Sequence, residues 1–304
     1  MKRIGRLTLA SVVMCFVLSA LGLTAEAQVR EYIRIAPEGA RASTAFGINA
    51  RGDIVGSFVD DQTSVTHGFL LSKGEFTVID FPATADNPAA AGTIARGISP
   101  SGKIVGNYWL PGDPAVASRG FLLTKKGEFV DVRYPGHSWE VAQRILPNGT
   151  ILGCRHDTDQ MATMRGVTIG KDGPSEIEAF GSMNNGATPD LRVIAGFWFN
   201  MMANQQQGYT IEDGVFTPFM VPGSNLTNAW DVNPEGVIVG TYRVGIGVGA
   251  VVRGFVRTGD SYSTIHYPES TVTRTFGIND SGDVVGNYVL GGRTYAYLAR
   301  VIEE

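Results

Sequence analysis

A small set of aromatic and charged residues recurs at equivalent places along the chain. Two adjacent positions of a repeated segment vary in chemistry, although two copies read Gly-Ile-Asn and a third reads Gly-Ile-Ser directly after the first of them. The variable residues are Phe46, Arg96, Gln143, Trp230 and Phe276 at the first position, and Arg144 and Asp231 at the second. If folding brings them together, they could hold a planar or charged small ligand. The alternative is structural: Arg96 or Arg144 pairs with Asp231 and the rings fill space.

Motifs of common enzymes are missing from the sequence. It contains no G-x-S-x-G, no H-E-x-x-H and no cysteine and histidine spacing of a zinc site. The acidic pair Asp60-Asp61 lacks the alternating carboxylates and central glycine of a calcium loop. The histidines are dispersed, at His67, His137, His156 and His266. We therefore expect no enzymatic activity, no bound metal and no cofactor.

The elements that must position these residues come from an internal repeat. A glycine ending an "IVG"-like triplet recurs with spacings of 50, 47, 43, 44 and 46 residues, at Gly56, Gly106, Gly153, Gly196, Gly240 and Gly286. The first copy reads as four short strands, FGIN, DIVGSFV, THGFLLS and EFTVIDF. Their two-sided apolar character suits strands that are covered on both faces, as in a propeller blade. Glycine inside the second strand indicates a close backbone approach, as where blades converge.

Both ends of the repeated region predict how the array closes. The last copy has no fourth strand, whereas EYIRIAP at 31–37 resembles a fourth strand ahead of the first copy. Pairing of 31–36 with 294–301 would complete the last blade and remove exposed sheet edges. We therefore predict an all-β fold, a six-bladed β-propeller of four-stranded antiparallel blades, closed by an N-terminal strand that completes the last blade. An open solenoid is the alternative.

Residues 1–27 are typical of a secretion signal. A basic start is followed by an apolar stretch over 7–23 and by the small-x-small cleavage site Ala25-Glu26-Ala27. We predict a signal peptide over 1–27, a single propeller domain over 28–304, and export to the periplasm or the outside. The blades are expected at about 45–82, 95–135, 142–180, 190–222, 229–268 and 275–304, the last with 31–37.

Charge and cysteine content narrow the possible partners and bonds. Without residues 1–27 the chain has 22 Lys and Arg and 28 Asp and Glu, a net charge of −6. A net negative charge does not favour the binding of nucleic acid. Only Cys154 remains, so no intramolecular disulfide can form, and we expect this thiol to be a buried small residue. No membrane span is expected once the signal is removed.

The connections between strands divide into two kinds. The first-to-second and third-to-fourth connections are short turns that contain glycine, whereas the other two vary in length and content. Because strand direction alternates, both variable connections lie on one face, and we expect binding there and at the channel mouth. Copy four is the least regular, with an Asn- and Gly-rich stretch at 181–189 that is expected to be a loop.

The repeat resembles the HAF-type repeats of secreted bacterial proteins. The shared block is GINxxGxIVGxY followed by HGFLxxxGxFTxIDFP, and it is clear in copies one, two, five and six, as at 277–288. Copies three and four depart from it, with Arg144-Ile145-Leu146 in place of Gly-Ile-Asn in copy three. The resemblance covers most of 31–304. It implies an exported repeat domain and no catalytic residues.

Taken together, the sequence favours an exported, non-enzymatic binding domain. Its partner would be a protein, a glycan or a small ligand, bound through the variable-loop face and the channel mouth. The alternative is a propeller hydrolase or lactonase with a divalent cation at the channel mouth, for which Asp231 is the chief acidic residue. A structural role in a surface layer is a third reading, which the sequence does not separate from the first.

Overall fold

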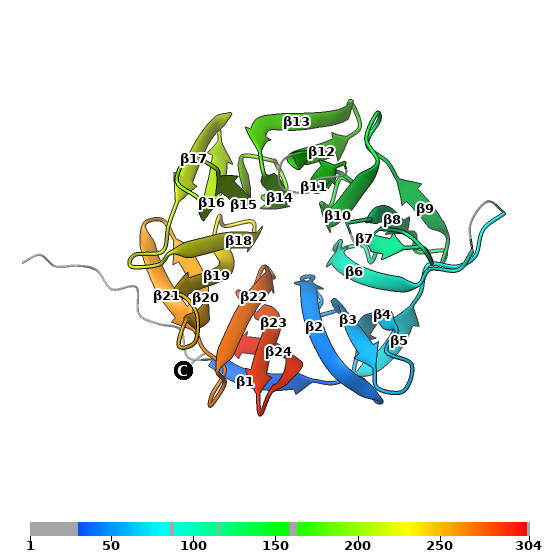
Figure 1. The fold of residues 1–304 in the computed structure, drawn as a ribbon, viewed down its shortest axis with the longest axis horizontal. Helices are drawn as coiled ribbons and strands as arrows, with labels where there is room; N and C mark the ends of the chain where they lie inside the picture. The colour runs from blue at the N-terminus through cyan, green and yellow to red at the C-terminus, as the bar shows by residue number, and fades with distance from the viewer. Residues whose placement is uncertain (1–29, 86–87, 115, 158–162, 303–304) are drawn as a thin grey trace, which may run out of the picture.

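A computed structural model describes residues 30–302 except 86–87, 115 and 158–162. The predicted signal peptide at 1–27 lies outside the described residues. In the described part the chain forms 24 β-strands. Figure 1 shows these strands as sheets arranged in a ring around a central axis. No helix of the described part is long and apolar enough to cross a membrane.

Taken in chain order, the strands form four-stranded units, which we number one to six. Unit one is β2 (Ala40–Ile48), β3 (Ile54–Asp60), β4 (Thr66–Ser72) and β5 (Glu75–Ile79). Unit two is β6 (Gly92–Ile98), β7 (Ile104–Trp109), β8 (Arg119–Leu123) and β9 (Phe129–Val132). Unit three is β10 (Trp139–Ile145), β11 (Ile151–His156), β12 (Arg165–Gly170) and β13 (Gly173–Phe180).

The remaining units follow the same plan. Unit four is β14 (Ser182–Ala187), β15 (Val193–Asn200), β16 (Gln205–Glu212) and β17 (Val215–Phe219). Unit five is β18 (Leu226–Val232), β19 (Ile238–Val244), β20 (Val251–Thr258) and β21 (Ser261–Ile265). Unit six is β22 (Val272–Ile278), β23 (Val284–Leu290), β24 (Arg293–Val301) and β1 (Arg30–Ile35). In Figure 1 the first strand of each unit lies nearest the axis.

Strand pairing within each unit is antiparallel. Units three and four are separate four-stranded sheets. Units one and two are joined by one parallel pair, Thr66 with Gly92, and units five and six by Val252 with Val272. The all-β class and the four-stranded antiparallel sheets predicted from the sequence are therefore confirmed.

The N-terminal strand pairs with the last part of the chain. Strand β1 lies antiparallel to β24, from Arg30 opposite Val301 to Ile35 opposite Ala296, which is the predicted pairing. The hydroxyl of Ser43 in unit one donates to Ile35 O and accepts the Ala296 N–H. Each innermost strand also contacts the next one around the ring, and β22 contacts β2.

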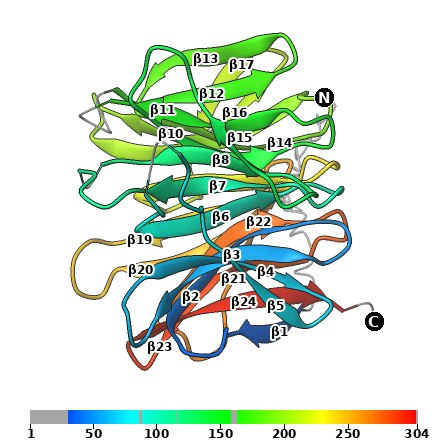
Figure 2. The ribbon, with the colours of Figure 1, turned by 90° about the vertical axis from the view of Figure 1, so that its right-hand side faces the viewer.

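The connections lie on two opposite faces, because the strands run between them, as the view in Figure 2 shows. On one face each innermost strand ends in a tight turn; in unit one the Gly52 N–H donates to Asn49 O and Gly52 has a φ of 79°. In unit four, Leu191 occupies the same place with a φ of 62°. Because Leu191 stands where the other copies have glycine, the turn of copy four cannot be recognised in the sequence. Its first strand, Ser182–Ala187, lies where the sequence predicted a loop and ahead of the predicted start at 190.

Every innermost strand carries a β-bulge at the same place. The pairing register shifts by one residue in each of the six strands. We call the residues at these shifts the bulge residues: Phe46, Arg96, Gln143, Asn185, Trp230 and Phe276. Five of them form the first of the two variable positions found in the sequence.

The bulge explains the recurring glycine of the second strand. A Cβ added at Gly106 would overlap Ile94 O of β6, and the same overlap occurs at Gly56 with Thr44 O and at the four other copies. The predicted close backbone approach is confirmed. It is an approach to the first strand of the same unit, rather than to a neighbouring unit.

Substitution of Gly106 tests this reading of the repeat. We expect Gly106→Ala to lower the free energy of unfolding by about 3 kcal/mol, because the new methyl group forces β6 and β7 apart. Gly52→Ala is the control: it has open space but a positive φ, and should cost about 1 kcal/mol. Urea unfolding of both variants checks the order. Equal losses would contradict it.

A buried polar side chain links each innermost strand to the chain before it. The hydroxyls of Thr93, Thr227 and Thr273 each accept a main-chain N–H that follows the fourth strand of the preceding unit, at 3.0 Å. In unit three the residue is Glu140, which is 2% exposed. Its Oε1 accepts the Gly120 N–H at 3.3 Å and contacts Arg133 at 3.2 Å, while its Oε2 has no partner among the described residues. Burial raises the pKa of Glu140 to about 7.

The raised pKa of Glu140 predicts a pH dependence of stability. The unfolded carboxyl loses its proton near pH 4.5 and the folded one only near pH 7, so the free energy of unfolding should fall as the pH rises between these values. The fall should reach up to about 3 kcal/mol. Glu140→Gln, which keeps the shape, should remove it. Urea titrations of both proteins at pH about 5 and about 8 measure the difference; parallel pH profiles would refute the assignment.

Candidate functional site

Bulge side chains from four units meet around the channel. The rings of Phe46 and Phe276 have centroids 5.2 Å apart, and Trp230 lies 5.2 Å from Phe276. The guanidinium carbon of Arg96 lies 5.0 Å from the centroid of the Phe46 ring. We call Phe46, Trp230 and Phe276 the aromatic floor. The structure thus brings together residues that lie up to 230 positions apart in the sequence.

Arg144 lies one residue after the bulge of β10 and fills the channel beside this floor. Its Nη1 donates to Phe46 O at 3.2 Å and to Arg96 O at 3.0 Å. Its Nη2 donates to Trp230 O at 3.3 Å and to Phe276 O at 2.8 Å. The same nitrogen lies 3.1 Å from Asp231 Oδ2, and both side chains are less than 10% exposed. The ion pair proposed as the structural alternative therefore exists, and it involves Arg144 rather than Arg96.

Arg144 and Asp231 lie on the tight-turn side of the channel. They line a cavity of only about 110 Å³ together with turn residues such as Asn49, Pro147 and Pro234. The sequence reasoning grouped them with a binding mouth on the variable-loop face. The structure places them at the opposite side of the channel. Each innermost strand runs toward its tight turn, and Arg144 and Asp231 are each the next-to-last residue of their strand. The pair closes the channel on that side.

Two other arginines lie on innermost strands without a carboxylate partner. The Nε of Arg96 donates to Asn107 Oδ1 at 2.5 Å, and its Nη1 to Gln143 Oε1 at 3.3 Å. Burial, with a smaller effect of Arg144, lowers the pKa of Arg96 to about 10. Arg274, two residues before Phe276 on β22, makes no hydrogen bond or ion pair with the described residues, and burial lowers its pKa. Both cations are partly buried and lack a countercharge.

Several buried polar atoms in the same region also lack partners. Among the described residues no hydrogen bond is made by Gln143 Nε2, Asn228 Oδ1, Thr241 Oγ1 or Asn287 Oδ1. Asn228 lies opposite Thr241, and Arg274 lies opposite Asn287. Buried polar groups are normally paired, so these atoms indicate a place for water or ligand.

These residues define what we call the channel site. It comprises the two arginines without a carboxylate partner, Arg96 and Arg274, and the aromatic floor. It also includes the four residues with unpartnered atoms, which are Gln143, Asn228, Thr241 and Asn287. Guanidinium groups bind carboxylate or phosphate, and aromatic faces stack on rings. The arrangement can therefore bind a small molecule that carries both an anionic group and a ring.

Sequence reasoning found only part of this site. Asn185, the bulge residue of unit four, lies outside the channel site and was not aligned with the other bulge residues, because copy four lacks the turn glycine. Arg274 and Asn228 were missed because they lie two residues before the first of the two positions that were compared. Aligning the residue two places before each bulge residue would have shown a charged and an amide side chain among mostly apolar ones.

The histidines and Cys154 have local partners or are buried. The Nδ1 of His67 lies 2.9 Å from Asp80 Oδ1, and the Nδ1 of His137 lies 3.0 Å from Asp157 Oδ2. Burial raises the pKa of the Cys154 thiol to about 12, so it does not act as a nucleophile near neutral pH. Within the described part of the chain, no three His, Cys, Asp or Glu side chains come together as metal ligands. The divalent cation of the hydrolase alternative does not fit the mouth, because the Asp231 carboxylate there already pairs with Arg144.

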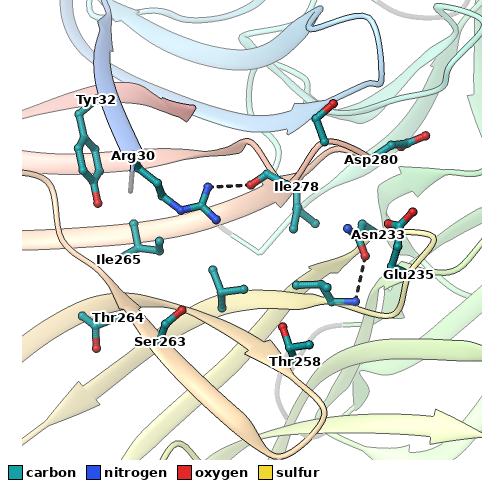
Figure 3. Close-up of a pocket in the computed structure, with 14 residues that line it drawn as sticks. Arg30, Tyr32, Asn233, Glu235, Thr258, Ser263, Thr264, Ile265, Ile278 and Asp280 are labelled. Carbon is teal, nitrogen blue, oxygen red and sulfur yellow. Dashed lines mark hydrogen bonds between the residues drawn. The ribbon is translucent and has the colours of Figure 1, made fainter. Parts of the chain in front are cut away.

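A larger cleft lies elsewhere, between units five and six. It has a volume of about 550 Å³, and Figure 3 shows Glu235 and Asp280 on one side of it and Arg30 and Tyr32 on the other. A smaller cleft of about 350 Å³ occupies the corresponding place between units three and four. Clefts of this kind therefore follow from the geometry of the repeat. None of the seven residues predicted as a site lines the larger one.

Comparison with known proteins places the fold among β-propellers. The PQQ-bound aldose sugar dehydrogenase of Streptomyces coelicolor matches with a TM-score of 0.51 and 10% identity, over 90% of this chain and 98% of that one. The sialidase of Trypanosoma rangeli gives 0.54 and 9% identity, over 87% of this chain and 55% of that one. TolB of Acinetobacter baumannii gives 0.52 and 9%, over 88% and 66%. No protein-family model and no curated protein matches the chain. At these identities the likeness establishes the fold alone.

These neighbours overturn one prediction. The sequence led us to expect a protein without enzymatic activity, because the motifs of common enzymes are missing. A sugar dehydrogenase and a sialidase share the fold, so missing motifs do not exclude catalysis on it.

Proposed function

We propose that this chain is a closed six-bladed β-propeller whose channel site binds a small anionic molecule that carries a ring. The proposal rests above all on Arg96 and Arg274, two partly buried guanidinium groups without a carboxylate partner. Closure of the ring is supported by the pairing of β1 with β24 and by the contact of β22 with β2.

The energetics favour an anion as the missing partner. Moving a charge out of water is costly unless an opposite charge or a set of hydrogen bonds compensates for it. Arg96 has two neutral acceptors, Asn107 and Gln143, and Arg274 has none among the described residues. A bound carboxylate or phosphate would supply that charge, and would leave Asn228 and Thr241 to bind its other polar groups.

The shape of the site favours access from the variable-loop face. Arg144 and Asp231 close the tight-turn side, leaving the small cavity described above. A ligand that enters from that face would stack its ring on Phe46 or Trp230, beside Arg96.

Catalysis at the same place is the second candidate. Enzymes that act on sugars occur among proteins of this fold, so a sugar acid bound at the channel site would be the first substrate to test. The hydrolase alternative carries over in this form, without a divalent cation at the mouth. Export from the cell and membership in the HAF-type repeats belong to the proposal as well, since 1–27 have the character of a signal peptide.

Charge removal tests the binding site. We expect Arg96→Gln and Arg274→Gln each to weaken the binding of benzoate or glucuronate about tenfold or more, because each loses a charge-assisted hydrogen bond. Arg192→Gln, an exposed arginine on the tight-turn face, is the control and should bind normally. Isothermal titration calorimetry measures the affinities. Unchanged binding by both channel variants would rule out the site.

Removal of one ring of the aromatic floor distinguishes stacking on the ligand ring from binding of its anionic group by the arginines. Trp230→Leu should weaken the binding of ring-bearing benzoate several-fold, because stacking contributes about 1 kcal/mol. Binding of ring-free acetate should stay the same, since the arginines remain. Equal losses for the two anions would show that the variant damages the fold instead.

Turnover is tested with the same proteins. If the channel site is an active site, a sugar acid that binds should be consumed by the wild-type chain and left unchanged by Arg274→Gln, as followed by NMR of the mixture. Binding without any change in the sugar acid would leave ligand binding as the function and would reject catalysis for that substrate.

A further inference from the structure

The main-chain oxygens of four of the six bulge residues converge on the side chain of Arg144. Phe46, Arg96, Trp230 and Phe276 each direct a carbonyl oxygen to the Arg144 guanidinium, at 2.8–3.3 Å. The carboxylate of Asp231 adds a fifth oxygen at 3.1 Å. These oxygens come from units one, two, five and six, whereas the guanidinium comes from unit three.

The repeat itself builds this arrangement. An innermost strand has an unpaired edge toward the axis, and the bulge turns the carbonyl of the extra residue out of the ladder. The next residue is glycine in four units, which lets the strands approach: a Cβ at Gly47 would come within 2.7 Å of Arg96 O, and one at Gly277 within 2.9 Å of Phe46 O. We therefore expect the oxygens to keep their positions when residue 144 is changed.

We propose that the four bulge carbonyls and Asp231 form a cation-binding cage, and that the guanidinium of Arg144 is the cation which this chain supplies to it. Carbonyl and carboxylate oxygens are acceptors only, so the cage carries partial and full negative charge that a planar, five-donor cation can satisfy. The cage binds the guanidinium head alone, because Arg144 Nε has no hydrogen-bond partner among the described residues.

The cage is separate from the channel site in its chemistry and in its test. The channel site offers unpaired cations to an anion, whereas the cage offers oxygens to a cation. If the protein binds no anion, the proposal of a cation cage still stands. If guanidinium does not rescue the Arg144 variant, the proposal of an anion site at Arg96 and Arg274 still stands.

Chemical rescue tests the cage. Arg144→Ala should lower the melting temperature by several degrees, because it leaves the oxygens and Asp231 unpaired in a buried place. Guanidinium chloride at millimolar concentration, far below the molar range in which it unfolds proteins, should restore most of that loss. Sodium chloride at the same ionic strength should not, and neither should urea, which has a similar shape without the charge.

Two control proteins make the result specific. The wild-type chain has a filled cage, and Arg96→Ala removes a guanidinium that is held by only two side-chain oxygens, so neither should gain stability from guanidinium. An equal gain in all three proteins, or equal rescue by urea, would overturn the proposal.

A variant that does not fold alone still gives an answer. If Arg144→Ala is insoluble, it is refolded with guanidinium, with sodium chloride or with urea, each at the same millimolar concentration. A higher yield of folded protein with guanidinium alone supports the cage, and the same yield in all three contradicts it. Arg144→Lys, which returns a cation to the cage, should be more stable than Arg144→Ala; equal stability would also count against it.

Discussion

The β-bulge in each innermost strand is the constraint on which the rest of the molecule depends. It forces glycine at the facing position of the second strand, because the carbonyl before the bulge occupies the space of a Cβ. It also places the carbonyl oxygens of four bulge residues around the guanidinium of Arg144. One local irregularity, repeated in register, thus produces both the sequence signature and the lining of the channel.

Much of the architecture could be predicted because glycine and proline leave clear marks in a sequence. The recurring Gly56 and its equivalents set the period, and the segment from Arg30 to Ile35 was recognisable as a displaced fourth strand. Unit four was placed wrongly because Leu191 adopts a positive φ that glycine adopts elsewhere. A residue other than glycine with a positive φ cannot be recognised as a turn residue from the sequence pattern.

The site was predictable only in part, for a different reason. The bulge residues could be aligned from the repeat, and the structure brings Phe46, Trp230 and Phe276 into contact, with Arg96 beside Phe46. Whether a charged side chain finds a partner depends on distances across the ring, which no spacing in the sequence encodes. Arg96 and Arg144 occupy adjacent positions of the repeat in neighbouring copies, yet Arg144 pairs with the carboxylate of Asp231 and Arg96 contacts only neutral acceptors.

The antiparallel pairing of β1 with β24 joins residues that are separated by nearly the whole chain. Such contacts have the largest loop-closure cost and tend to form late in folding, so the last sheet is completed only when both ends of the chain are present. A chain cut short at either end would expose a long unpaired β24 or β1 edge, and edges of this kind associate with other strands. The pairing of β1 with β24 therefore covers one edge of each strand that would otherwise be open to association.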